Sequence, residues 1–306
     1  MNWSNIFLTP YQLTVSRMLC LNPEYLGLVK DWLGLAAGQK ILDAGCGTGS
    51  LSFYLGRTMQ GLSFTGLDLD EEYLRFAQKE AAALKDGNQY TFVNGDAAAL
   101  PFPDGCFDAV VSLTFLTVAA DTEKILAEMK RVTKPGGRIV SLAPAVFASG
   151  AFCSDPDWTD RLPEKERLLF DELRRLSAKL YQLKSELVPP PSFVQGLPPD
   201  KLPAFFQANG LKEVGLHALG NVFSLSNAAM PEEDKRRFIE LSELTLLTEA
   251  ERLQSLPEIR EHFSAAEFDL YTEAVKAKCA WQLAHLNDNF SWECQPSLLL
   301  VLIGKV

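Results

Sequence analysis

A glycine-rich turn is the part of the sequence best suited to chemistry. It reads Asp43-Ala44-Gly45-Cys46-Gly47-Thr48-Gly49 and follows the apolar run Ile41-Leu42, so it joins a predicted strand to a predicted helix. Glycines let the backbone approach a ligand closely, and the following helix presents free N–H groups. The spacing is G-x-G-x-G, whereas a pyrophosphate-binding turn reads G-x-G-x-x-G. Because Asp43 repels a pyrophosphate and attracts a cation, the turn favours a positively charged, phosphate-free nucleoside ligand.

Two further acidic residues end later predicted strands. Asp68, in Gly66-Leu67-Asp68-Leu69-Asp70, lies about 20 residues past the last glycine, where a carboxylate can accept hydrogen bonds from both ribose hydroxyls. Asp96, in Asn94-Gly95-Asp96-Ala97, ends the next strand. The alternatives are structural: Asp68 as a solvated carboxylate, Asp96 as a cap on the following turn, and Asp43 as an acceptor for backbone N–H groups of the glycine turn.

In order and spacing, these stretches resemble class I S-adenosylmethionine (SAM) dependent methyltransferases. Two later stretches, Leu100 to Val111 and Arg131 to Gly137, are similar to the ubiquinone/menaquinone C-methyltransferase-like branch, also called methyltransferase type 11. The resemblance covers residues 41–140 and implies SAM as cofactor and S-adenosylhomocysteine (SAH) as product. The cofactor-binding residues that it implies are Asp43, Gly45, Cys46, Gly47, Gly49, Asp68, Leu69, Asp96, Ala97 and Ser112.

No catalytic residue can be assigned from the sequence. The family often places polar or His residues near the reacting methyl group after the fourth strand, but Ser112 to Thr117 contain no His, Asp or Glu. Transfer to a nucleophilic acceptor needs only positioning and desolvation. The six cysteines form no C-x-x-C pair, so neither a zinc site nor a disulfide framework is expected.

Short apolar runs alternate with helical stretches from Lys40 onward, which predicts a parallel sheet with helices on both faces. The expected strands are 41–42, 63–67, 90–93, 107–112, 138–142, 211–219 and 297–303; the expected helices include 50–59, 71–84, 163–187 and 199–209, another capped by Asp121, and one opened by the capping box Ser264 to Glu267. Lys134 to Gly137 reads as a turn. The predicted fold class is therefore α/β, a Rossmann-like seven-stranded, mostly parallel sheet with additional helical insertions.

We expect residues 1–306 to form a single methyltransferase domain. Its parts are an N-terminal helical cover at 1–37, a SAM-binding core at 40–142, a first insertion or lid at 143–196, a helix and strand of the core at 197–220, a second helical insertion at 221–296 and a final core strand at 297–306. Tyr11 is a candidate to fold over the cofactor. Aromatic residues of the insertions either line an acceptor pocket or belong to the core: Phe147, Trp158, Tyr181, Phe193, Tyr271, Trp281 and Trp292.

The predicted helix 163–187 carries a leucine stripe made of Leu169, Leu173, Leu176, Leu180, Leu183 and Leu187. Such a stripe either packs the helix on the domain or forms a dimer seam, so we expect a monomer or a homodimer.

The amino-acid composition and the net charge argue against several classes of function. The chain is 47% hydrophobic and 22% charged, as in ordinary globular proteins, and its net charge is −10. This charge repels phosphate backbones on average, so we expect no nucleic-acid partner. No apolar run approaches the roughly 20 residues of a membrane span, and the N-terminus does not read as a signal peptide, so we expect a cytoplasmic protein.

Together these features predict a SAM-dependent methyltransferase that acts on a small, partly apolar acceptor. One alternative is a non-catalytic SAM- or SAH-binding module whose insertions serve protein contact. Another is a protein or RNA methyltransferase, and the negative charge disfavours RNA.

Overall fold

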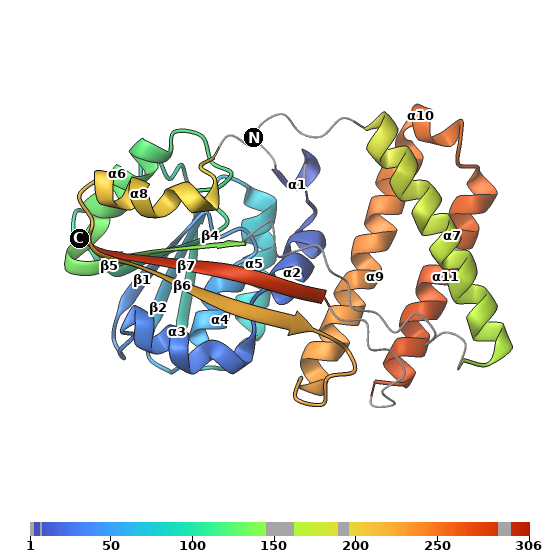
Figure 1. Ribbon diagram of the computed structural model, residues 1–306, viewed down its shortest axis with the longest axis horizontal. Helices are drawn as coiled ribbons and strands as arrows, with labels where there is room; N and C mark the ends of the chain where they lie inside the picture. The colour runs from blue at the N-terminus through green and yellow to red at the C-terminus, as the bar shows by residue number, and fades with distance from the viewer. Residues whose placement is uncertain (1–2, 7, 145–161, 189–195, 287–294) are drawn as a thin grey trace. The chain divides into compact units, whose positions relative to one another are not determined.

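The computed structural model describes residues 3–6, 8–144, 162–188, 196–286 and 295–306 (Figure 1). The chain divides into two compact units. We call one the sheet unit (Met1–Gly150, Phe193–Asn221 and Pro296–Val306) and the other the helical unit (Ala151–Ser192 and Val222–Gln295). The helices of both predicted insertions thus gather into one unit. The description of the whole chain as a single domain stays a prediction.

The described strands of the sheet unit form one seven-stranded sheet in the order β3-β2-β1-β4-β5-β7-β6. Their bounds are β1 (Lys40–Ala44), β2 (Ser63–Asp68), β3 (Gln89–Asn94), β4 (Phe107–Leu113), β5 (Thr133–Pro144), β6 (Lys212–Phe223) and β7 (Gln295–Lys305). Neighbouring strands among β1 to β5 pair in parallel, and β7 runs antiparallel to β5. The predicted α/β sheet is confirmed. Because the strand order reverses between β1 and β4, a ligand crevice is expected at their carboxyl ends.

Helices cover both faces of this sheet, as Figure 1 shows. Those of the sheet unit are α1 (Trp3–Ile6), α2 (Pro10–Met18), α3 (Leu26–Leu33), α4 (Ser50–Gly56), α5 (Glu71–Ala83), α6 (Thr122–Val132) and α8 (Leu202–Ala208), with short 3-10 turns at Pro23–Tyr25 and Pro199–Lys201. Along β1, Ile41 packs into a core with α3 and α4, and Leu42 packs into a second core with α6 and α8. A strand buried on both faces must be apolar at successive positions, which explains the short apolar runs in the sequence.

Two local predictions need correction. Lys134 to Gly137, predicted as a turn, lie within β5; Gly136 has a φ of 78°, and the pairing with β4 shifts register between Phe107 and Ala109. The bend is therefore an irregularity inside a longer strand. Asp121 precedes α6 as predicted, but its φ is 52° and its side chain makes no capping hydrogen bond.

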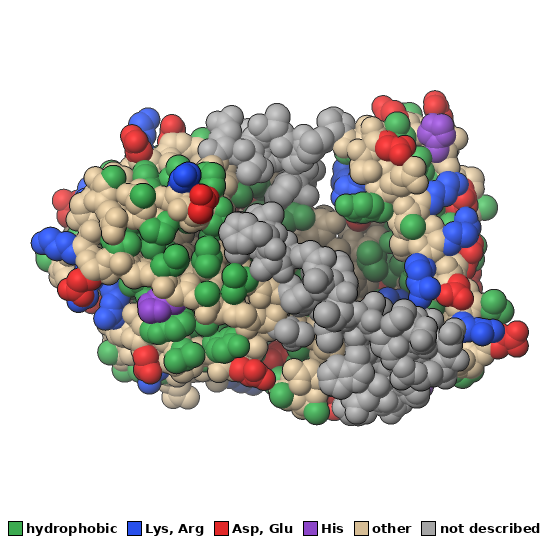
Figure 2. Space-filling model, in the orientation of Figure 1, with side chains coloured by type: hydrophobic (Ala, Val, Ile, Leu, Met, Phe, Trp, Pro, Cys, Tyr) green, Lys and Arg blue, Asp and Glu red, His purple; other side chains and the backbone are tan. Residues whose placement is uncertain are grey.

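The helical unit is a bundle with a core of its own. Its described helices are α7 (Glu164–Leu187), α9 (Glu232–Ser255), α10 (Pro257–Arg260) and α11 (Ala265–Ala284). Leu173, Leu176 and Leu180 of the predicted stripe are buried in a core shared with α9 and α11, whereas Leu187 is 37% exposed. The middle of the stripe therefore packs within the chain, and the oligomeric state stays a prediction. Figure 2 shows side chains of both charges interspersed on the visible face of these helices.

The candidate aromatic residues of the insertions have different surroundings. Tyr271 is buried in the helical core, and Trp281 packs edge-on against Phe170. Tyr181 is 75% exposed. The other four, Phe147, Trp158, Phe193 and Trp292, lie outside the described residues. None of the described three therefore supports an acceptor pocket inside the helical unit. No helix in the described part of the chain has the length and hydropathy to cross a membrane.

Replacing Ser264 with Ala tests the predicted capping box of α11. Ser264 Oγ accepts the N–H of Glu267 at 3.3 Å, and a Glu267 carboxylate oxygen accepts the Ser264 N–H at 2.8 Å. We expect Ser264→Ala to lower the free energy of unfolding by about 1 kcal/mol in urea titrations. Ser255→Ala, which removes an exposed hydroxyl bonded to the Arg252 carbonyl, is the control and should change it by less than about 0.5 kcal/mol. Equal effects of the two substitutions would contradict the capping role.

Candidate functional site

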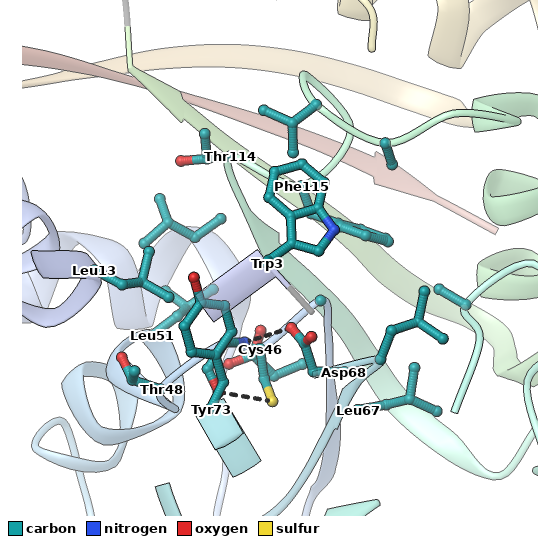
Figure 3. A pocket seen from close by; sticks show the side chains of 18 of the residues that line it. Trp3, Leu13, Cys46, Thr48, Leu51, Leu67, Asp68, Tyr73, Thr114 and Phe115 are labelled. Carbon is teal, nitrogen blue, oxygen red and sulfur yellow. Dashed lines mark hydrogen bonds between the residues drawn. The ribbon is translucent and has the colours of Figure 1, made fainter. Parts of the chain in front are cut away.

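A cavity of about 460 Å³ opens in the sheet unit where β1, β2 and β4 end. This is within the range of roughly 300–1,000 Å³ that is typical of small-molecule sites. Figure 3 shows the side chains of Trp3, Asp68 and Phe115 around it. Eight of the ten predicted cofactor-binding residues line it: Asp43, Gly45, Cys46, Gly47, Asp68, Leu69, Asp96 and Ala97. Gly49 and Ser112 do not.

The glycine turn is held in a conformation that only glycine fits. Gly45 and Gly47 have φ values of 69° and 53°, in the left-handed region. A Cβ atom on Gly45 would lie 2.3 Å from the Phe115 ring, and one on Gly47 would lie 2.7 Å from a Leu13 methyl group. The N–H groups of Gly45 and Cys46 both donate to the carbonyl of Leu67, at 2.8 and 3.0 Å. These bonds fasten the turn to the end of β2.

Gly49 does not line the cavity but lies at the start of α4. It precedes α4 with a φ of 76°, and a Cβ atom there would lie 2.8 Å from the Phe53 ring. Its role in this structure is to start the helix, so the prediction that it contacts the cofactor finds no support in the cavity lining.

Asp68 joins the glycine turn to the loop after β2. Its Oδ2 accepts the Gly47 N–H at 2.8 Å, and its Oδ1 accepts the Asp70 N–H at 2.9 Å. Burial raises the pKa of this carboxyl above its ordinary value, and these two N–H donors partly offset that effect. A carboxylate has about four acceptor positions, so lone pairs remain for a ligand. The structural role and the predicted ribose role are therefore compatible.

Asp43 is 1% exposed at the end of β1. Its Oδ2 accepts the Ser52 hydroxyl from α4 at 2.8 Å, while its buried Oδ1 has no partner among the described residues. Burial raises the pKa of Asp43 to about 7. A buried oxygen without a donor is costly, so its persistence beside a cavity points to a ligand that supplies one.

Asp96 and Ala97 lie just after β3, which ends at Asn94. Ala97 is buried, whereas Asp96 is exposed and its Oδ1 accepts the Ala98 N–H at 2.8 Å. The alternative of a turn cap is therefore observed, and Asp96 lines the cavity as well.

The region after β4 differs from the prediction. Ser112 is fully buried within the strand, and the cavity is lined by Leu113, Thr114 and Phe115. Thr114 has a φ of 63°, which costs a β-branched residue about 1–3 kcal/mol, and its buried hydroxyl has no partner among the described residues. A strained residue with an unused hydroxyl at a cavity wall is typical of a functional position.

The N-terminal segment supplies lining residues that the sequence did not reveal. Trp3, Leu8, Leu13 and Arg17 line the cavity, whereas Tyr11, the sequence candidate, packs edge-on against Phe76. The sequence T-x-x-Q that begins at Thr9 forms a capping box, and it could have predicted the start of α2. It does not indicate which face of α2 lies against the cavity.

Hydrogen bonds fix this N-terminal segment to the rest of the site. The Ser4 N–H donates to Asp70 at 2.7 Å, and the Tyr73 hydroxyl donates to the Leu8 carbonyl at 2.6 Å. The Thr14 and Thr48 hydroxyls meet at 3.1 Å. These hydrogen bonds hold the N-terminal segment in place as one wall of the cavity.

Charge in the cavity is unbalanced. Four carboxyl groups line it, those of Asp43, Asp68, Asp96 and Asp121, and among the described lining residues Arg17 is the single basic one. This excess favours a cationic ligand. The unpartnered Asp43 oxygen and the glycine turn also fit SAM, which carries a sulfonium and an ammonium group.

Comparison with known proteins agrees with this geometry. Residues 42–141 match the family model described as a methyltransferase domain. The chain is 41% identical over 116 residues to a demethylmenaquinone methyltransferase of Thermus thermophilus, covering 38% of this chain and 52% of that protein. It is 38% identical over 102 residues to a fatty-acid O-methyltransferase of Mycolicibacterium smegmatis, covering 33% and 35%. The chain thus spans about half or less of the length of these curated relatives.

A solved structure supports the fold. The phosphoethanolamine N-methyltransferase 2 of Haemonchus contortus aligns with a TM-score of 0.50 at 19% identity, covering 99% of this chain and 58% of that protein. At this identity the likeness shows the fold alone. The family match and the strand order together show that residues 42–141 are similar to a methyltransferase domain and lie in a sheet of the fold that such domains have.

Proposed function

We propose that the chain is an enzyme that moves a methyl group from SAM to a small, partly apolar acceptor. The observation that carries the proposal is one cavity in the sheet unit that joins an acidic, glycine-lined part to an apolar part. A cytoplasmic location and the absence of a nucleic-acid partner, both expected from the sequence, belong to this proposal.

The acidic part fits the cofactor. In the proposed arrangement Asp68 accepts the ribose hydroxyls, Asp96 and the Ala97 N–H contact the adenine, and the glycine turn lies against the amino-acid end. Asp68 is preset for this role because the Gly47 and Asp70 N–H groups fix both of its oxygens. When bound, SAM supplies a methyl group activated by the adjacent sulfonium.

The apolar part fits the acceptor. The same cavity is lined by the apolar side chains of Trp3, Leu8, Phe115, Val118 and Ile125, which favour an acceptor that displaces water from it. A dry site strengthens the nucleophile because the nucleophile loses its hydration shell. Thr114 offers a buried hydroxyl at this wall that can orient a polar atom of the acceptor. The names of the relatives add support, since menaquinone precursors and fatty acids are both largely apolar.

Product analysis tests the proposal. We expect incubation with SAM and a panel of thiol, amine, phenol, quinol and fatty-acid acceptors to give a product 14 mass units heavier in at least one class, with stoichiometric SAH. Asp68→Ala should greatly reduce both products and serves as the inactive control. Binding of SAM without methylation of any acceptor class would instead support the non-catalytic binding module.

A further inference from the structure

The proposed arrangement of the cofactor leaves Asp121 without a role, although Asp121 lines the same cavity. It belongs to residues 113–125, which run from the end of β4 into the first turn of α6 and which we call the β4–α6 segment. Among the residues of this segment that line the cavity, Thr114 and Asp121 are polar and the others are apolar. Figure 3 shows Thr114 together with the neighbouring Phe115. The two polar residues therefore lie in a wall that is otherwise apolar.

The backbone of the β4–α6 segment fixes both polar residues in place. Thr114 and Asp121 have φ values of 63° and 52°, in the left-handed region, which Asp tolerates better than a β-branched residue does. The Thr114 N–H donates to the Leu142 carbonyl at 2.7 Å, and the Leu197 N–H donates to the Leu116 carbonyl at 3.0 Å. These hydrogen bonds connect the segment to β5 and to the residues that precede α8, so the surrounding structure maintains its unfavourable backbone.

Both polar side chains have unused hydrogen-bonding capacity. Asp121 immediately precedes α6, yet its carboxylate makes no capping hydrogen bond, and no ion pair joins it to a described residue. A helix cap, the usual structural reason for an Asp at this position, is therefore not what Asp121 provides. The Thr114 hydroxyl oxygen is buried and has no partner among the described residues. Two polar groups of one apolar wall are thus available to a ligand.

The charges of the cavity indicate which acceptor groups fit beside Asp121. A carboxylate only accepts hydrogen bonds, so its partner on a ligand is an O–H or N–H group. An acceptor that presents its own carboxylate would be repelled by Asp121 and by the other acidic residues of the lining, Asp43, Asp68 and Asp96. The apolar residues of the segment favour an apolar body. An alcohol, a phenol or a neutral amine meets these conditions.

We propose that the acceptor is an alcohol, phenol or amine with an apolar body, and that Asp121 accepts the hydrogen bond of the O–H or N–H group that becomes methylated. A lone pair of this oxygen or nitrogen forms the new bond to the methyl carbon. The carbon–sulfur bond breaks, its electron pair stays on sulfur to give SAH, and the proton of the acceptor passes to the Asp121 carboxylate. Because Asp121 is exposed, the proton then leaves to water. This assignment rests on the proposed function and adds the chemical class of its acceptor.

A matched set of compounds separates the acceptor classes. p-Cresol, p-toluidine and p-toluate share one apolar ring and carry a hydroxyl, an amino and a carboxylate group. We add them to the acceptor panel described above and locate the transferred methyl group by mass spectrometry and NMR. Products should carry the methyl group on a hydroxyl oxygen or an amine nitrogen, and p-toluate should give none.

Asp121→Asn tests the residue, because it keeps the size of the side chain and Asn also tolerates the left-handed backbone. It should lower kcat by about 100-fold or more for an acceptor that the wild-type protein methylates. In calorimetry on the full chain saturated with SAH, p-cresol and p-toluidine should bind about tenfold more weakly, whereas p-toluate should not. SAH itself should bind within about twofold of the wild-type affinity. Glu123→Gln, which removes an exposed carboxyl group from the first turn of α6, is the matched control and should change none of these values.

Asp121→Gly covers the case in which Asp121→Asn does not fold, because glycine adopts a φ of 52° without strain. It should lower kcat to a similar extent. A folded variant with the wild-type kcat would overturn the proposal, and an equal loss of SAH and acceptor binding would overturn it in favour of a structural role. Methylation on a carboxylate, a thiol or a carbon atom would also overturn it while the proposed function stands. If no acceptor of the panel were methylated, the proposed function itself would fail, which is a separate outcome.

Discussion

Asp68→Ala is expected to weaken SAH binding by about 2–4 kcal/mol, a factor of roughly 30 to 1,000. Part of this loss comes from the ribose hydroxyls, which lose a charged acceptor. The rest comes from the protein, because the Gly47 and Asp70 N–H groups lose the oxygens that hold them at 2.8 and 2.9 Å. Calorimetric titration of SAH into the folded variant measures the sum.

The two contributions can be separated with a ligand that lacks one hydroxyl. Wild-type protein should bind 2′-deoxy SAH less tightly than SAH, and Asp68→Ala should bind both equally. Glu71→Ala, at an exposed position at the start of α5, is the matched control and should leave both affinities unchanged. If the variant still distinguished the two ligands, the ribose would contact another group, and Asp68 would only support the turn.

The acidic part of the cavity wall was predictable because its residues lie at or just after the ends of strands. Asp43 and Asp68 lie near the ends of β1 and β2, and Asp96 lies two residues after β3; parallel strands bring their carboxyl ends to one edge of the sheet. The seven-strand sheet follows from the short apolar runs of the sequence, which are apolar at successive positions because both faces are covered.

Other parts of the site depend on contacts between distant segments, which periodicity does not encode. Ser4 meets Asp70, and Leu13 covers Gly47, although dozens of residues separate the members of each pair. Ser112 was expected to line the cavity. In the structure β4 continues to Leu113, and the cavity is lined by Leu113, Thr114 and Phe115 instead. The one-residue difference matters because side chains alternate between the two faces of a strand.

Asp43 illustrates a conflict between stability and binding. Burial raises its pKa to about 7, from an ordinary value of 3.8. The empty folded protein therefore keeps a proton on Asp43 between pH 4 and 7, where the unfolded chain has already released it. Because the folded state binds more protons in this range, the contribution of Asp43 to stability falls as pH rises, and the full cost is present above pH 7. A cationic ligand reverses this cost, since it favours the charged carboxylate.

Asp43→Asn should consequently make the empty protein more stable and the cofactor complex weaker. At pH 8 we expect the variant to unfold in urea with about 2–4 kcal/mol more stability than the wild-type protein, and the difference should shrink toward pH 4. SAM should bind at least 10-fold more weakly, because a neutral amide cannot attract its ammonium. Ser52→Ala is the opposing control: it removes the donor to Oδ2 and should lower stability at pH 8. A loss of stability in Asp43→Asn at pH 8 would mean that the carboxylate serves the fold more than the ligand.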